Sequence, residues 1–149
     1  RTDAERTGFA KQLELTITLP LGPNGADRAI DVTLLPRSQV RPSSSLLDGV
    51  YLHQFMPEQL NGPIGLIGKP LVADDGYEGE TVWYDALSAN PFVAKCSEPV
   101  SVDVQSRCIR SVYLGPGIAA VYGFDIDVLE SWKQFDALIR SRLSKTGAL

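Results

Sequence analysis

The chain has 149 residues, of which 44% are hydrophobic and 21% are charged, and its formal net charge is −4 at pH 7. These values are near the average for one globular domain with its own core, and they exclude a disordered chain, a collagen and a coiled coil. The acidic balance, without a basic cluster, argues against nucleic-acid binding. No segment approaches the ~18 consecutive apolar residues of a membrane-spanning helix.

The first twelve residues are polar and charged, and we interpret residues 1–12 as a lead-in to a single domain over residues 13–149. The chain begins with Arg1 rather than Met, which fits a processed protein. We expect the lead-in either to tether the domain to a lipid anchor or to be an ordinary frayed terminus.

Two alternating patterns near the N-terminus predict a pair of strands. Apolar and polar residues alternate over residues 13–19 and again over residues 30–34, as in half-buried strands. The Gly-Pro-Asn-Gly sequence at 22–25 has turn chemistry, so we expect a hairpin with a long loop. The pattern over residues 46–55 is ambiguous, and we favour a strand with a short helical entry.

The middle of the chain predicts further strands. Three glycines and two prolines over residues 62–72 suit an irregular or bulged strand, and residues 81–84 and 91–96 have the composition of short strands. Two longer apolar runs flank the Gly-Pro-Gly sequence at 115–117, which is a strong hairpin signal.

The C-terminal residues predict an amphipathic helix. Asp127 can cap its N-terminus, with Glu130 at capping-box spacing, and Gly147 can end it. Apolar residues recur at helical spacing, and we expect the tryptophan among them to pack on the sheet; they are Leu129, Trp132, Phe135, Leu138 or Ile139, and Leu143. The predicted fold class is therefore α+β, a mostly antiparallel β-sheet with a C-terminal amphipathic helix packed on it.

Cys96 and Cys108 are the two cysteines of the chain, and a turn-rich segment separates them. We expect a disulfide between neighbouring strands and therefore an oxidising compartment, as for a periplasmic or secreted protein; two unrelated buried thiols are the alternative. The spacing is not that of a zinc site or a redox C-x-x-C motif. His53 is the one histidine, and no nucleophile motif accompanies it, so we expect neither an enzyme nor a cofactor.

An acidic-aromatic segment over residues 72–85 is the most distinctive part of the sequence. It holds five of the eighteen acidic residues, and no lysine or arginine occurs between Lys69 and Lys95. A solvated loop leading into a core strand is one interpretation. Calcium binding by the carboxylates is another, although the EF-hand pattern is absent.

The functional interpretation of this segment is a recognition surface for a protein. Negative charge steers a basic partner, and aromatic rings supply contact area. Trp83 and Tyr84 point to opposite faces of the predicted strand, and we assign Trp83 to the core and Val82, Tyr84 and Glu80 to the exposed face. The candidate partner-binding residues are Asp74, Asp75, Tyr77, Glu78, Glu80, Tyr84 and Asp85.

The C-terminal third carries a pattern that resembles a known family. Residues 108–143 read CIRSVYLGPGIAAVYGFDIDVLESWKQFDALIRSRL, in which a strand, a tight turn, a second strand and a helix follow in order. This order is similar to the end of several small periplasmic immunity proteins of type VI secretion systems. Those proteins are often lipid-anchored, and they block toxic enzymes such as phospholipases or peptidoglycan hydrolases.

The resemblance implies a periplasmic protein whose partner is a cognate toxin, which it binds and neutralises. No residue role is carried over from the family, because no diagnostic motif is shared. Two alternatives stay open: a structural or assembly factor of the cell envelope, and a carrier of a small ligand.

Overall fold

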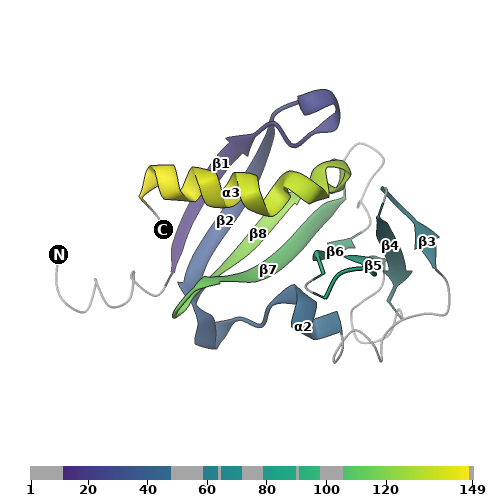
Figure 1. The fold of residues 1–149 in the computed structure, drawn as a ribbon, viewed down its shortest axis with the longest axis horizontal. Coiled ribbons are helices and arrows are strands. Elements are labelled where there is room, and N and C mark those ends of the chain that lie inside the picture. Colours follow the sequence, from purple (N-terminus) through teal and green to yellow (C-terminus); the bar gives the residue numbers. More distant parts are fainter. Residues whose placement is uncertain are drawn as a thin grey trace.

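The computed structural model describes residues 12–47, 59–63, 65–71, 79–89, 91–97 and 106–147. Within them the chain forms an antiparallel sheet in the order β1-β2-β8-β7-β6-β5-β4-β3 (Figure 1). The strands are β1 (Leu13–Leu19), β2 (Arg28–Pro36), β3 (Leu60–Asn61), β4 (Leu66–Pro70), β5 (Glu80–Asp85), β6 (Val93–Ser97), β7 (Arg107–Gly115) and β8 (Ile118–Asp125). The helical elements are η1 (Pro23–Gly25), η2 (Arg37–Gln39), α2 (Ser43–Leu47), η4 (Ile126–Ser131) and α3 (Trp132–Thr146).

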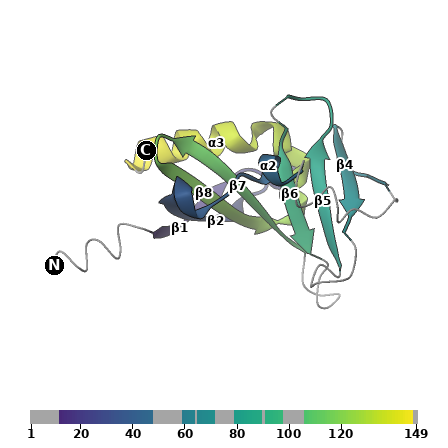
Figure 2. The ribbon, with the colours of Figure 1, turned by 90° about the horizontal axis from the view of Figure 1, so that it is seen from below.

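The predicted α+β class is confirmed. β1 and β2 form the expected hairpin, and β7 and β8 form the second one around the Gly-Pro-Gly turn. β2 also pairs with β8, so the N-terminal hairpin lies beside the C-terminal one. α3 crosses one face of these four long strands, and the shorter strands lie beyond them (Figures 1 and 2).

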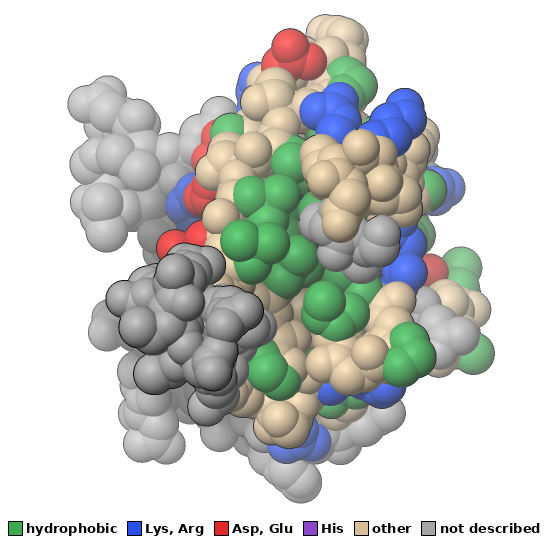
Figure 3. All heavy atoms as spheres, turned by 90° about the vertical axis from the view of Figure 1, so that its left-hand side faces the viewer, with side chains coloured by type: hydrophobic (Ala, Val, Ile, Leu, Met, Phe, Trp, Pro, Cys, Tyr) green, Lys and Arg blue, Asp and Glu red, His purple; other side chains and the backbone are tan. Residues whose placement is uncertain are grey.

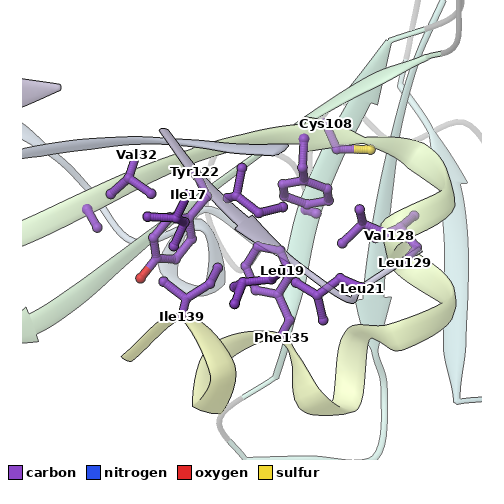
Figure 4. Close-up of a cluster of buried hydrophobic side chains, with 14 of the residues drawn as sticks. Ile17, Leu19, Leu21, Val32, Cys108, Tyr122, Val128, Leu129, Phe135 and Ile139 are labelled. Atoms are coloured by element: carbon purple, nitrogen blue, oxygen red, sulfur yellow. The ribbon is translucent and has the colours of Figure 1, made fainter. Parts of the chain in front are cut away.

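The core lies between α3 and the strand face beneath it (Figure 4). Because side chains alternate along a strand, every second residue of β1, β2 and β8 points toward α3. The ring of Phe135 is fully buried at the centre of this layer. Its centroid lies 4.8 Å from that of Phe124, 5.4 Å from that of Tyr122 and 5.7 Å from that of Phe92. This aromatic cluster fixes α3 on the sheet.

α3 begins later than the sequence predicts. The 3-10 turn η4 precedes it, and the residue before its first turn is Ser131, without a side-chain cap. The prediction that Asp127 caps the helix is wrong, because its carboxylate accepts hydrogen bonds from Arg28, with Nη2 and Oδ2 2.8 Å apart. A guanidinium offers a carboxylate paired, charge-assisted hydrogen bonds. Gly147 ends the helix at a φ of 81°, as predicted.

Two tryptophans pack on glycines of the β3–β4 hairpin. β4 is the strand predicted over residues 62–72, and the short β3 before that range pairs with it. A Cβ added at Gly68 would lie 2.6 Å from the ring of Trp83, and one at Gly65 would lie 2.7 Å from the ring of Trp132. Gly65 also has a φ of 93°, which side chains disfavour. The glycines therefore allow the rings to contact the backbone of this hairpin. Among the described residues, no helix has the length and apolar character needed to cross a membrane.

Candidate functional site

The predicted disulfide is present and joins two halves of the sheet. Cys96 in β6 lies opposite Cys108 in β7, and the two are bonded. Lys95 and Ile109 form the neighbouring register pair, and beyond it the described parts of β6 and β7 no longer pair. The bond therefore reinforces a short ladder of strand pairs. Because it restricts the unfolded chain, it adds about 3 kcal/mol to the free energy of unfolding.

A cleft opens where β7 separates from β6. The N–H of Ser111, which has no strand neighbour on this side, donates to Ser43 Oγ in α2 at 2.8 Å. α2, β7 and α3 thus surround a space of about 360 Å³. Its lining residues are Pro42, Ser44, Pro91, Arg110, Val112, Tyr113, Asp136 and Arg140.

Arg110 forms the floor of this cleft, with 6% of its surface exposed. Its guanidinium donates to both carboxylate oxygens of Asp136, at 3.1 and 2.6 Å, and to the carbonyl of Val93 at 3.1 Å. The same group lies 4.4 Å above the ring of Phe92. Burial, and secondly the carboxylate of Asp136, raise the pKa of the neighbouring Tyr122 above its ordinary range. The hydrogen bonds and the ring contact of Arg110 hold its side chain in one arrangement.

A second arginine, Arg140, lines the cleft, and Arg37 stacks on another lining residue, Tyr113. Arg140 of α3 donates to the carbonyls of Tyr113 and Leu114, each at 3.2 Å, and its side chain is otherwise exposed. The guanidinium of Arg37 lies 4.0 Å above the ring of Tyr113. The lining of the cleft thus carries the two guanidinium groups of Arg110 and Arg140 and the single carboxylate of Asp136, in a protein whose net charge is −4. This local sign reversal makes the cleft an anion-attracting site.

The residues predicted to bind a partner fall into separate places. Asp74, Asp75, Tyr77 and Glu78 lie outside the described residues. Glu80 and Tyr84 are on the face of β5 that points away from α3, and Glu80 forms an ion pair with Lys95 at 3.2 Å. Asp85 points to the opposite face and accepts the N–H of Leu87 at 3.0 Å. Glu80 and Asp85 therefore have local partners and do not form one acidic cluster.

The orientation of β5 agrees with the sequence in one respect and differs in another. Trp83 is half-buried and packs against the core, as predicted. The prediction that Val82 shares an exposed face is wrong, because its side chain is fully buried. Val82 lies between Lys69 and Lys95 in neighbouring strands, whose long aliphatic stems can cover an apolar residue. Tyr84 and Glu80 on the same face are partly exposed.

The turn between β5 and β6 exposes a large apolar side chain that sequence reasoning did not single out. Leu87 is 93% exposed at this turn. The hydrogen bond from its N–H to Asp85 holds it in a defined turn. The turn lies on the α3 side of the sheet (Figure 2), and Pro91 at its end lines the cleft. Leu87 and the cleft thus lie on the same side of the sheet.

The opposite end of the molecule also exposes apolar side chains. Figure 3 shows hydrophobic side chains gathered at the end where β1 begins and α3 finishes, with acidic side chains on one flank and basic ones on the other. Leu13, at the start of β1, is 53% exposed there.

In the described part of the chain, no group of three or more His, Cys, Asp or Glu residues is placed to hold a metal ion. His53 and the acidic residues considered for calcium at 74, 75 and 78 lie outside it. No protein-family model, curated protein or solved structure matches this chain.

Proposed function

We propose that this protein is a periplasmic binding protein that neutralises a toxic enzyme, as an immunity protein of a type VI secretion effector. The observation that carries the proposal is the β5–β6 hairpin, which the disulfide joins to the main sheet and whose turn exposes Leu87. A structural disulfide is typical of an oxidising compartment. An apolar side chain held on a rigid scaffold is a suitable anchor for a pocket in a partner.

Charge supports the same proposal. The carboxylate of Glu80 is neutralised by Lys95, so we assign the steering charge of the acidic-aromatic segment to Asp74, Asp75 and Glu78. These residues attract a basic surface, such as the rim of an active site that binds phospholipid or another anionic substrate. Inhibition then requires only that the bound protein covers the site.

Growth protection tests the proposal. The enzyme encoded by the adjacent gene is exported to the periplasm of a host, with or without this protein in the same compartment. We expect growth to be restored by the parent protein and to be impaired by Leu87→Asp. Leu60→Asp is the matched control, because Leu60 is also exposed, at 39%, in the same half of the sheet. Equal killing with and without the parent protein would overturn the proposal.

A further inference from the structure

The cleft between α2, β7 and α3 combines two kinds of surface that the proposed function has not used. Pro42, Pro91 and Val112 give it apolar walls, and Arg110 and Arg140 give it guanidinium groups. Its volume of about 360 Å³ lies within the range of small ligand sites. Such a lining fits a side chain with an aliphatic stem and an anionic end.

The arginines are positioned before any ligand arrives. Arg110 is held by Asp136, by the carbonyl of Val93 and by the ring of Phe92. Arg140 uses two N–H groups on carbonyls of β7, and a guanidinium has five donors. Preorganised donors lose little side-chain entropy on binding, and guanidinium pairs with carboxylate in a planar, specific geometry.

We propose that this cleft binds a glutamate side chain of an acidic segment in the partner protein. The carboxylate contacts Arg140 at the rim, and the methylene groups lie against the prolines and Val112. Asp136 opposes this binding because its negative charge neutralises part of the field of Arg110. The inference rests on the proposed function only in naming the partner as the toxin, and the recognition chemistry belongs to the cleft itself.

A peptide titration tests the cleft without the toxin. A tetraglutamate peptide with both ends blocked is titrated into the ¹⁵N-labelled protein, and the amide shifts of Val112, Tyr113 and Asp136 are followed. Tetraglutamine is the neutral control peptide, and citrate is the free-carboxylate control. We expect saturable shifts with tetraglutamate, and weaker effects with both controls.

Matched variants locate the binding. Arg140→Gln should weaken the peptide about tenfold, because it removes a charge-assisted hydrogen bond. Arg142→Gln changes the net charge equally on the same helix, but Arg142 donates to the carbonyl of Thr18 in β1. The affinity of this variant for the peptide should therefore change less than twofold. Asp136→Asn should tighten binding severalfold. If Asp136→Asn fails to fold, the comparison of the two arginine variants decides alone.

Several outcomes would overturn the inference. They are the absence of saturable shifts, equal binding of tetraglutamine, equal losses in Arg140→Gln and Arg142→Gln, and binding of citrate without binding of the peptide. These results would leave the growth-protection test unaffected, and failure of that test would leave peptide binding unaffected. The two proposals therefore fail separately.

Discussion

Replacing Phe135 with alanine perturbs the centre of the core. The ring is fully buried and lies within 6 Å of three other aromatic rings. Truncating a buried phenylalanine typically costs about 3–5 kcal/mol, and the lost aromatic pairs place this site in the upper part of that range. At about 2–4 °C per kcal/mol for a chain of this length, the melting temperature should fall by about 8–20 °C. This is a large fraction of an ordinary domain's stability.

Thermal unfolding followed by far-UV circular dichroism measures the effect. Gln134→Ala is the control, because Gln134 is exposed on the same helix and its loss should cost at most ~0.5 kcal/mol. Trp132→Ala should fall between the two, since Trp132 packs on the core but is only half-buried. If Phe135→Ala melted together with Gln134→Ala, α3 would not close the core, and the fold described here would be wrong.

Further outcomes are expected for the disulfide, for Tyr122 and for the candidate partner-binding residues. Thiol titration of the denatured, unreduced protein should find no free thiol, and reduction should cost about 3 kcal/mol. Burial raises the pKa of Tyr122, so the contribution of its neutral hydroxyl to folding stability is present below pH ~10 and is lost as pH rises further. Because phenylalanine cannot ionise, Tyr122→Phe should resist alkaline unfolding better than the parent. Neutralising Asp74, Asp75 and Glu78 together should slow association with the proposed toxin partner and flatten the salt dependence of the association rate, whereas Tyr84→Ala should speed dissociation, both in surface-binding kinetics.

Local periodicity explains why most elements of the fold could be predicted. Alternation marks β1 and β2 because only their α3-facing residues are buried, and the Gly-Pro-Gly turn marks the β7–β8 hairpin. Helical spacing likewise identifies Phe135 and Ile139 as core residues. Alternation failed to predict the burial of Val82, because both faces of β5 are partly covered and only this side chain is fully buried.

The cleft was beyond sequence reasoning because its parts meet only in the folded chain. Ser43 and Ser111 are 68 residues apart, and Arg110 and Asp136 are 26 apart. One signal was present: Arg110 alternates with Cys108 and Val112, so a charged residue occupies an inward position of a predicted strand. Such a residue needs a buried partner or has a functional role. The exposure of Leu87 had no comparable signal, since a leucine beside a turn is ordinarily buried.

Titration of the enzymatic activity of the proposed toxin tests directly whether this protein is an inhibitor. The purified product of the adjacent gene is assayed on its own substrate, phospholipid vesicles or peptidoglycan, with increasing amounts of this protein. If the protein is an inhibitor, activity falls to a plateau at a fixed stoichiometric ratio. Leu87→Asp then needs a large excess to reach that plateau, while Leu60→Asp behaves like the parent. Activity that stays unchanged at every ratio, with no complex on size-exclusion chromatography, would show that this protein does not neutralise that enzyme.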